Sequence, residues 1–383
     1  MSRISLSIVA MMALVATVAC KTTPSGTGGE EETSQAPESF DPGTMVKTGI
    51  QGVYAYKPPP ASFNPDTASD QELERYGFPP LANQLKYRLP KFEVIVPELQ
   101  VTNRRNGPTR ILTARRTSAT TGVSTSSNWS GYAVTVPSGT FTQARSMVFT
   151  TLKVPVPHCT SAGGPYHLSA WPGIDGAGIG QVTSPDVLQG GVEMDATCIS
   201  PGKARIDART AWIEWFPENE IAINNFPLNF NEQIQVMVWW ELQRSLGHVA
   251  FINLTTHKGP VFALVPPLGV HLLGNTAEWI IERPEINGQY STLTPYSPSV
   301  FIDARANINA GAQYFIPQEA PSPSSGAVMY QIQLQPSGSP PISIACAACA
   351  QPSPITDEEI VFRYVLGSGQ NQCQAPYPNC IGP

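Results

Sequence analysis

The sequence has little charge for its length. Only 14% of its 383 residues are charged, against about 25% in an average soluble domain. The formal net charge of -6 provides no basic face of the kind that binds nucleic acid. Prolines number 38, roughly twice the average share. This composition is typical of a loop-rich, exported β protein rather than of a cytosolic helical one.

Several catalytic motifs are missing. The sequence has no GxSxG nucleophile elbow, no HExxH zinc motif, no Walker phosphate loop and no Asp-Thr-Gly or Asp-Ser-Gly of the aspartic proteases. The five histidines are scattered without a metal-binding spacing. Serine-nucleophile, zinc and nucleotide chemistry are therefore disfavoured, and neither a metal nor a cofactor is expected. Carboxylates and amides remain as candidates for catalysis.

The first twenty residues have the composition of an export signal. Arg3 supplies the positive start, residues 4–18 form an apolar run, and small residues precede Cys20. The run is too short for a membrane span. Residues 17–20 resemble a bacterial lipoprotein processing site, although Thr17 stands where Leu is usual. Lipidation of Cys20 would make the protein a membrane-anchored lipoprotein of the cell envelope, and without it the protein would be secreted.

Six cysteines remain when Cys20 is set aside. An even number in an oxidising compartment predicts up to three disulfides. Six cysteines allow 15 pairings, and their spacing does not choose among them. We therefore expect disulfides without assigning partners.

The chain divides into four regions by composition. Residues 1–20 form the signal peptide, and residues 21–125 form a tether and pro-segment-like region that is rich at first in Gly, Ser, Thr, Pro and Glu. Residues 126–315 have the pattern of a β domain. Residues 316–383 combine a Pro- and Ser-rich linker with a C-terminal extension. That extension either completes the β domain or forms a small appendage.

Arginines cluster between residues 103 and 116, at Arg104, Arg105, Arg110, Arg115 and Arg116. Two interpretations fit this cluster. It is a solvated linker, or it is a pro-segment whose cations pair with acidic groups of the domain until acid or cleavage releases it. The second interpretation predicts a mature first residue between Thr117 and Ser127.

Short strands dominate the β domain. Several alternate cleanly, for example with Ile234, Val236 and Val238 on one face. Many strands at short spacing, with almost no amphipathic helix, predict an antiparallel β-sandwich. The predicted strands cover residues 131–136, 146–154, 168–173, 186–194, 208–216, 234–242, 248–254, 261–264, 278–282 and 299–303, with two more at 328–334 and 359–366.

The strand within residues 275–283 contains an acid of special interest. Side chains alternate along a strand, so Glu278 and Ile280 face the opposite side to Trp279. A carboxylate beside bulky apolar side chains is costly to bury without a partner or a task. Glu278 is therefore a candidate catalytic group, unless its strand lies at the surface with the acid in solvent.

Other blocks accompany this strand: Asn128-Trp129-Ser130-Gly131, AWPGIDG at residues 170–176, VLQGGVE at residues 187–193 and AWIEWFP at residues 211–217. Gln189 lies beside two glycines, which let a ligand come close. The last block places Trp212, Glu214 and Phe216 on one strand face. In this order the blocks resemble the glutamic peptidases, the eqolisin or G1/A4 family, and the resemblance covers residues 126–305.

The resemblance implies a sandwich of two bent antiparallel sheets, of the concanavalin or jelly-roll kind, with an active-site groove on its concave face. It implies that Gln189 and Glu278 form the catalytic pair of an acid-active endopeptidase, here a bacterial lipoprotein-like member. It also implies a substrate site lined by Trp171, Asp175, Gly191, Glu193, Trp212, Glu214 and Phe216. The family more often has Asp at Glu193 and Tyr at Phe216.

The residue types suit peptide hydrolysis, which needs a base for water, an acid for the leaving amine and donors for the oxyanion. Glu278 would act as base and then acid, and the Gln189 amide would donate to the oxyanion. Proteins or peptides would be the substrates of a monomeric enzyme. Two alternatives use the same sandwich: a glycoside hydrolase with Glu278 and Glu214 as its carboxyl pair, and a binding or adhesion module without catalysis.

Overall fold

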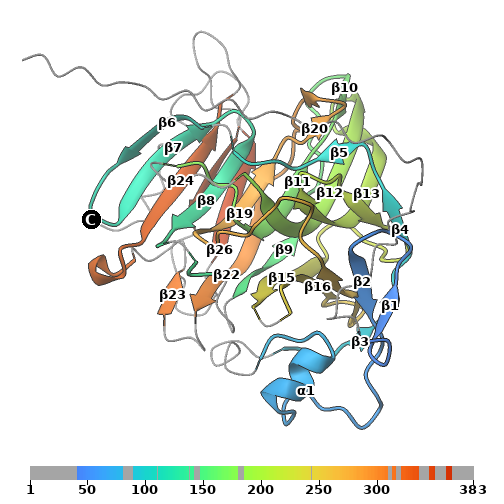
Figure 1. Ribbon diagram of the computed structural model, residues 1–383. Coiled ribbons are helices and arrows are strands. Elements are labelled where there is room, and N and C mark those ends of the chain that lie inside the picture. The colour runs from blue at the N-terminus through green and yellow to red at the C-terminus, as the bar shows by residue number, and fades with distance from the viewer. Residues whose placement is uncertain are drawn as a thin grey trace, which may run out of the picture. The chain divides into compact units, whose positions relative to one another are not determined.

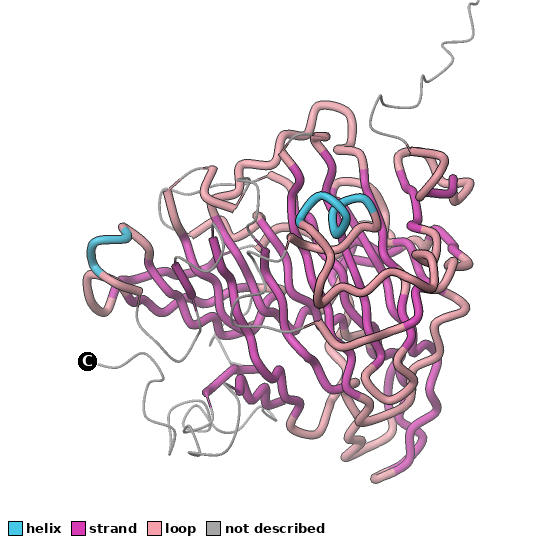
Figure 2. The backbone as a smooth tube through the Cα atoms, turned by 90° about the horizontal axis from the view of Figure 1, so that it is seen from below, coloured by secondary structure: helices cyan, strands magenta, loops and turns pink. Residues whose placement is uncertain are grey.

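Almost every regular element of the protein is a β-strand (Figure 2). The computed structural model describes residues 41–80, 89–109, 111–137, 139–141, 147–179, 185–242, 244–308, 313–315, 321–335, 345–349 and 359–364. They fall within one compact unit, Ser39–Pro383. The export signal and Cys20 lie outside these residues, so signal processing and lipidation stay predictions. No helix in the described part of the chain is long and apolar enough to cross a membrane.

One layer, which we call the site sheet, carries the blocks singled out in the sequence (Figure 1). All its neighbouring strands are antiparallel except the parallel pair β7 and β24. In hydrogen-bonded order it consists of β6 (Ile111–Arg116), β7 (Thr121–Ser126), β24 (Val328–Leu334), β8 (Trp129–Thr135), β19 (Thr276–Glu282), β11 (Ser169–Ile174), β12 (Val187–Ser200), β13 (Lys203–Phe216), β14 (Ile221–Ile223) and β4 (Leu99–Val101).

The second layer, the back sheet, is antiparallel throughout its main order. It runs β25 (Ala345–Cys349), β26 (Glu359–Tyr364), β22 (Ser299–Ile308), β9 (Met147–Lys153), β15 (Gln233–Glu241), β16 (Leu246–Asn253), β18 (Val261–Leu264), β2 (Val53–Tyr56) and β1 (Met45–Lys47). Short strands extend both layers: β3 (Glu93–Val94), β10 (Gly163–Tyr166), β17 (Lys258–Gly259) and β23 (Gln313–Phe315). The layers join where β24 pairs with β25.

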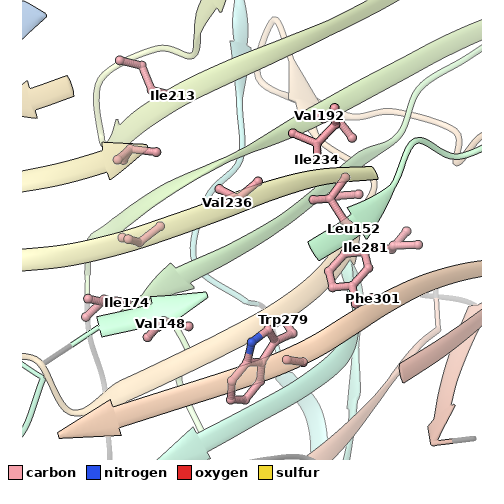
Figure 3. Packing of buried hydrophobic residues seen from close by; sticks show 14 of the residues in the cluster. Val148, Leu152, Ile174, Val192, Ile213, Ile234, Val236, Trp279, Ile281 and Phe301 are labelled. Carbon is pink, nitrogen blue, oxygen red and sulfur yellow. The ribbon is translucent and has the colours of Figure 1, made fainter. Parts of the chain in front are cut away.

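The hydrophobic core lies between the two sheets. Val192 and Ile281 of the site sheet and Val236 of the back sheet belong to the same buried cluster (Figure 3). The indole N–H of Trp279 in β19 donates to the Phe149 carbonyl of β9 at 3.0 Å. Since Trp279 faces this core, its neighbours Glu278 and Ile280 face the other side of the site sheet, as the alternation predicts. The antiparallel sandwich predicted from the sequence is confirmed.

Residues on the amino-terminal side of the β domain add to both layers. β4 pairs with β14 of the site sheet, and β2 pairs with β18 of the back sheet. Helix α1 (Asp70–Arg75) begins after Ser69, whose hydroxyl accepts from the Glu72 amide at 3.2 Å. Leu73 of this helix is fully buried. The sequence offers little core here, yet these residues are packed against the sandwich.

The carboxyl-terminal region also joins the sheets. After a short 3-10 turn at Pro323–Ser325, β24 lies between β7 and β8. β26 pairs with β22 at one edge of the back sheet. These two strands therefore extend the sandwich rather than standing apart from it.

A disulfide joins Cys159 to Cys198 across 39 residues. It links the loop after β9 to the far end of β12. This pair bears out the expectation of disulfide bonding. The side chains of the four remaining cysteines lie outside the described residues, so their pairing stays open.

Candidate active site

Gln189 and Glu278 lie on the same face of the site sheet. Gly173 of β11 is in register with Gln189 of β12 on one side and with Glu278 of β19 on the other. Directly paired residues point to the same face, and glycine places no side chain between the two. A Cβ at Gly173 would lie 3.2 Å from the Gln189 Cβ and 2.8 Å from the Trp171 ring. The gap between the amide and the acid therefore depends on this glycine.

Glu278 is fully buried. Burial raises its pKa well above the ordinary value, and the carboxylates Asp175 and Asp186 raise it further, whereas the Thr276 side chain and the Ala177 amide lower it. Among the described residues, neither carboxylate oxygen makes a well-aligned hydrogen bond, although the Thr276 hydroxyl and the Ala177 N–H lie near enough to lower the pKa of Glu278. An acid with two unsatisfied buried oxygens is costly. The site therefore holds a carboxyl group with its hydrogen-bonding capacity available.

The chain's own residues 104–109, which we call the leader segment, lie across this face. The Gln189 side-chain amide donates to the main-chain carbonyl of Asn106. The Asn106 main-chain N–H donates to both Glu214 oxygens, at 3.1 and 2.9 Å. Its side-chain amide donates to Glu214 at 3.0 Å and to Glu220 at 2.9 Å. The face expected to bind substrate thus carries a segment of the chain itself, and Gln189 binds a peptide carbonyl of that segment.

The next residues of the leader segment follow the same face. The Gly107 carbonyl accepts from the Trp129 indole at 3.2 Å, and the Thr109 amide donates to the Gly176 carbonyl at 3.0 Å. A Cβ at Gly107 would lie 3.0 Å from the Phe216 ring. A side chain at this position would therefore require the Phe216 ring to shift.

Arg104 begins the segment in a pocket of acids. Its guanidinium pairs with Glu193 at 2.8 Å, with Asp195, and with Glu220 at 3.8 Å. Asp195 also contacts His167 Nδ1 at 2.8 Å. The Arg104 side chain is only 7% exposed, and the three acids raise its pKa. This buried cluster confirms that at least one arginine of the sequence cluster pairs with acidic groups of the domain.

Backbone pairing holds the segment as well. β5 (Arg104–Arg105) pairs with β20 (Glu285–Ile286), which continues into β21 (Gln289–Tyr290), and Figure 1 shows β5 beside β20. On the other side the Glu220 amide donates to the Arg104 carbonyl at 3.0 Å. The segment is therefore bound as an added strand, the way many peptides bind a sheet edge.

The aromatic residues predicted to line the site surround a second buried acid. The Trp171 indole donates to Glu282 at 3.1 Å, and Asn128 donates to the other Glu282 oxygen at 3.0 Å. Trp171 and Trp129 meet edge to face at 4.9 Å. Burial raises the pKa of Glu282, so its carboxyl group favours the neutral form. These contacts form the floor of the site beside Glu278.

Three more predicted site residues share the face. Gly191 lets the strands come close, because a Cβ there would lie 2.2 Å from the Ala170 carbonyl oxygen. Trp212 pairs with Gly191, and Glu214 pairs with Gln189. The register thus confirms that Trp212 and Glu214 point to the same side as Gln189.

Asp175 ends β11 in a left-handed conformation, with φ of 72°. Its carboxylate accepts the amides of Leu273, Gly274 and Asn275 at 2.7, 2.9 and 3.1 Å. Burial and the neighbouring Asp186 nevertheless raise its pKa to about 7. Asp175 therefore fixes the chain that enters β19 and acts on Glu278 through charge, rather than by contact with the leader segment.

The sequence did not single out Asn106, Asp195 or Glu220. Glu220 stands in a polar loop whose pattern matches that of an ordinary turn, and Asn106 contacts the site from a region far from the matched blocks. Contacts between such distant segments become visible only in the fold.

Comparison with known proteins identifies the family of this chain. The Peptidase A4 family model matches residues 127–344, more than half of the chain. The chain is therefore a glutamic peptidase, an endopeptidase that belongs to the Peptidase A4 family. The comparison with curated proteins finds no match.

Solved structures with similar folds are glutamic peptidases. Scytalido-glutamic peptidase with a transition state analog inhibitor shares 22% identity over 62% of this chain and 98% of that chain, with a TM-score of 0.46. SCP-B, an eqolisin in a complex with the tripeptide Ala-Ile-His, shares 20% identity over 62% and 98%, with a TM-score of 0.41. Aspergilloglutamic peptidase from Aspergillus niger shares 22% identity over 52% and 99%, with a TM-score of 0.39.

Proposed function

We propose that Glu278 and Gln189 carry out peptide hydrolysis in this peptidase, with acidic conditions as its working range. The Glu278 carboxylate takes a proton from water, and the water oxygen attacks the peptide carbonyl carbon. The Gln189 amide donates to the oxyanion that forms. Glu278 then returns the proton to the leaving nitrogen.

One arrangement supports these roles above all. Gln189 donates to a peptide carbonyl, that of Asn106, while Glu278 lies across Gly173 with both oxygens free of hydrogen bonds to the described residues. The remaining contacts suit substrate binding. Glu214 accepts a main-chain N–H of the bound peptide, and Phe216 limits the residue after the carbonyl.

The burial of Glu278 affects the pH range in which this carboxyl group is ionised and can act as a base. A base must be ionised, and burial is the largest cause of the raised pKa of Glu278. In this proposal, removal of the leader segment admits water to the carboxyl group and weakens this cause. The open enzyme then has an ionised base at a lower pH than the closed one.

The glycoside hydrolase alternative is not favoured by these contacts. Both oxygens of Glu214 accept the N–H of a peptide group, which is a role in peptide binding rather than in protonating a sugar oxygen. Family membership also points to peptide bonds.

Degradation of unfolded casein at pH 4 tests the proposal. The full chain is preincubated at the assay pH and compared with Glu278→Gln and Gln189→Ala. We expect Glu278→Gln to be inactive, and Gln189→Ala to lose roughly 100- to 1,000-fold in kcat, as for removal of an oxyanion donor. Unchanged circular dichroism shows that the fold is kept. Wild-type rates in Glu278→Gln would exclude the assigned base.

Localisation is a second proposal. The export signal and Thr17-Val18-Ala19-Cys20 support a cell-envelope lipoprotein that acts as a monomer on proteins or peptides. Incorporation of labelled fatty acid into the wild-type chain but not into Cys20→Ala tests the anchor. Equal labelling, or none in either chain, would leave a secreted protein instead.

A further inference from the structure

We propose that Glu282 is a positioning residue of this peptidase. Its carboxyl group holds Asn128 and Trp129 where they bind the carbonyl of the substrate residue that follows the cut bond. The inference rests on the proposed roles of Gln189 and Glu278. It uses the leader segment only to show how a peptide lies on this face of the site sheet.

Glu282 ends β19 and lies on the same face as Glu278, four residues before it. It pairs in register with Trp129 of β8 on one side and with Ser169 of β11 on the other. Glu282 is fully buried. An acid is more costly to bury than an apolar side chain, so a carboxyl group at this place indicates a use beyond packing.

Both oxygens of Glu282 accept hydrogen bonds. Oε1 accepts from the Asn128 side-chain amide at 3.0 Å, and Oε2 accepts from the Trp171 indole at 3.1 Å. Burial raises the pKa of Glu282, and the N–H groups of Asn128, Trp171 and Trp129 oppose this rise. The carboxyl group therefore joins side chains from both sides of β19.

The orientation of the Asn128 amide is fixed at both ends. Its oxygen accepts from the Ser126 hydroxyl at 2.9 Å, and its nitrogen donates to Glu282. An amide nitrogen carries two N–H groups, and Asn128 also donates to the carbonyls of Pro108 and Gly107, at 3.3 and 3.5 Å. Without Glu282 as acceptor, the amide could turn away from the peptide.

Trp129 supplies the closer donor. Its indole N–H donates to the Gly107 carbonyl at 3.2 Å, and its ring meets the Trp171 ring edge to face at 4.9 Å. Because Glu282 accepts from the Trp171 indole, it also fixes the ring against which Trp129 packs. In a substrate bound like the leader segment, these donors hold the carbonyl that follows the one at Gln189.

This second carbonyl is not the one that water attacks. It is the same in the bound substrate and in the transition state, so hydrogen bonds to it stabilise both about equally. Interactions of this kind lower KM and leave kcat nearly unchanged. A loss of Glu282 should therefore raise KM, and only for substrates that carry this carbonyl.

A pair of substrates tests the inference. The first is a fluorogenic peptide that the wild type cuts at one mapped bond. In the second, an (E)-alkene replaces the next amide, which removes the carbonyl oxygen and the N–H after it and keeps the length. We expect the wild type to prefer the first peptide by about tenfold or more in kcat/KM, as for the loss of one or two hydrogen bonds.

The preference should change in the Glu282 variants. In Glu282→Met it should fall below about threefold, mainly through KM on the amide peptide. Glu282→Gln, whose side chain has one acceptor oxygen instead of two, should lie between Glu282→Met and the wild type. Trp129→Phe should lower the preference as well, and adding Glu282→Met to it should lower the preference little further.

Ile281→Val is the matched control, because Ile281 precedes Glu282 in β19 and belongs to the core, where loss of a methylene loosens the packing. It should keep the wild-type preference. Equal losses on both peptides in Glu282→Met would show a purely structural role and overturn the inference. If circular dichroism shows that Glu282→Met does not fold, the same criterion applies to Glu282→Gln.

The wild type alone can also overturn the inference, by cutting the two peptides equally well. Casein digestion at pH 4 is followed in parallel with the peptide assays. A wild type that digests casein and shows no preference leaves the proposed function standing and removes only the role of Glu282. Digestion by Glu278→Gln at the wild-type rate would remove the proposed function, and this inference with it.

Discussion

The side-chain amide of Gln189 donates to the main-chain carbonyl of Asn106, so the proposed catalytic face is occupied by the chain's own backbone. The occupant is bound by a strand pairing, a buried ion cluster and hydrogen bonds on both sides of one peptide group. Each of these elements can be changed separately.

The gap between the amide and the acid depends on Gly173. In Gly173→Ala the new methyl group would meet the Trp171 ring at 2.8 Å, and overpacking of this kind costs about 1–3 kcal/mol. We expect a loss of about that size in the free energy of unfolding and at least a tenfold loss in kcat/KM on casein. Gly178→Ala is the matched control, since its nearest foreign atom lies 3.8 Å away. Equal kcat/KM values on casein in both variants would show that catalysis does not depend on the space between the Gln189 and Glu278 side chains.

Asp175 holds the entry to the strand of Glu278. Asp175→Ala leaves three buried backbone amides without their acceptor, and each unsatisfied group costs about 1–3 kcal/mol. We expect the free energy of unfolding to fall by about 3 kcal/mol or more in urea titrations. Asp207→Ala, at an exposed aspartate that pairs with Arg205 on the β12–β13 hairpin, should change it by less than about 1 kcal/mol. A small effect of Asp175→Ala on the free energy of unfolding would show that residues 273–275 keep their conformation without these hydrogen bonds.

The buried carboxyl groups predict that the closed protein is less stable at alkaline pH. Burial raises the pKa of Asp175 to about 7 and that of Glu193 to about 9, and it raises the pKa values of Glu214 and Glu278 as well. The folded protein therefore binds more protons than the unfolded chain above about pH 4. Stability then falls as pH rises from about 4 towards 9.

Two groups act in the opposite direction at low pH. The pKa of Glu241 is lowered to about 2 although its burial opposes this, because His248 and Arg244 hydrogen-bond to it, and burial lowers the pKa of His248. Glu241 therefore lowers the free energy of unfolding as pH falls below about 4.5, and His248 lowers it as pH falls below about 6.5. Urea unfolding followed by tryptophan fluorescence should give a higher free energy at pH 5 than at pH 9, and Glu193→Gln should reduce the difference. A free energy that rises with pH would contradict the assignment.

The disulfide Cys159–Cys198 closes a loop of 39 residues. Loop-closure entropy alone gives about 4 kcal/mol of stabilisation for a loop of this length. We expect the double variant Cys159→Ala, Cys198→Ala, and the reduced wild type, to unfold at clearly lower urea concentrations than the oxidised protein. Matching unfolding midpoints in all three would show that strand pairing already restrains this loop.

Much of the sandwich could be predicted from the sequence, because its central strands are apolar on one or both faces. Residues 261–264 match β18, and residues 328–334 match β24. β7 was missed because Thr and Ser dominate it, so its buried positions do not show an apolar pattern, and it is held by pairing with β24 and β6. Local pattern cannot show pairing of that kind.

The candidate site, like the fold, could be predicted from the sequence only in part. The prediction that Trp212 and Glu214 share a face follows from the alternation of side chains along one strand. The prediction that Gln189 lies next to Glu278 rested on the resemblance to a family. Neither the strand alternation nor the family resemblance predicted the position of the leader segment, because the contact of Arg104 with Glu193 joins residues 89 positions apart in the sequence. A charge cluster in sequence indicates that partners exist and leaves open which they are.

β24 enters the site sheet between β7 and β8, two strands that follow one another closely in the chain. The layer that carries Glu278 therefore stays incomplete during synthesis until residue 334 has left the ribosome. Such long sequence separation slows folding. A truncated chain that ends before this point would lack one of the two neighbours of β8, the strand that pairs with the strand of Glu278.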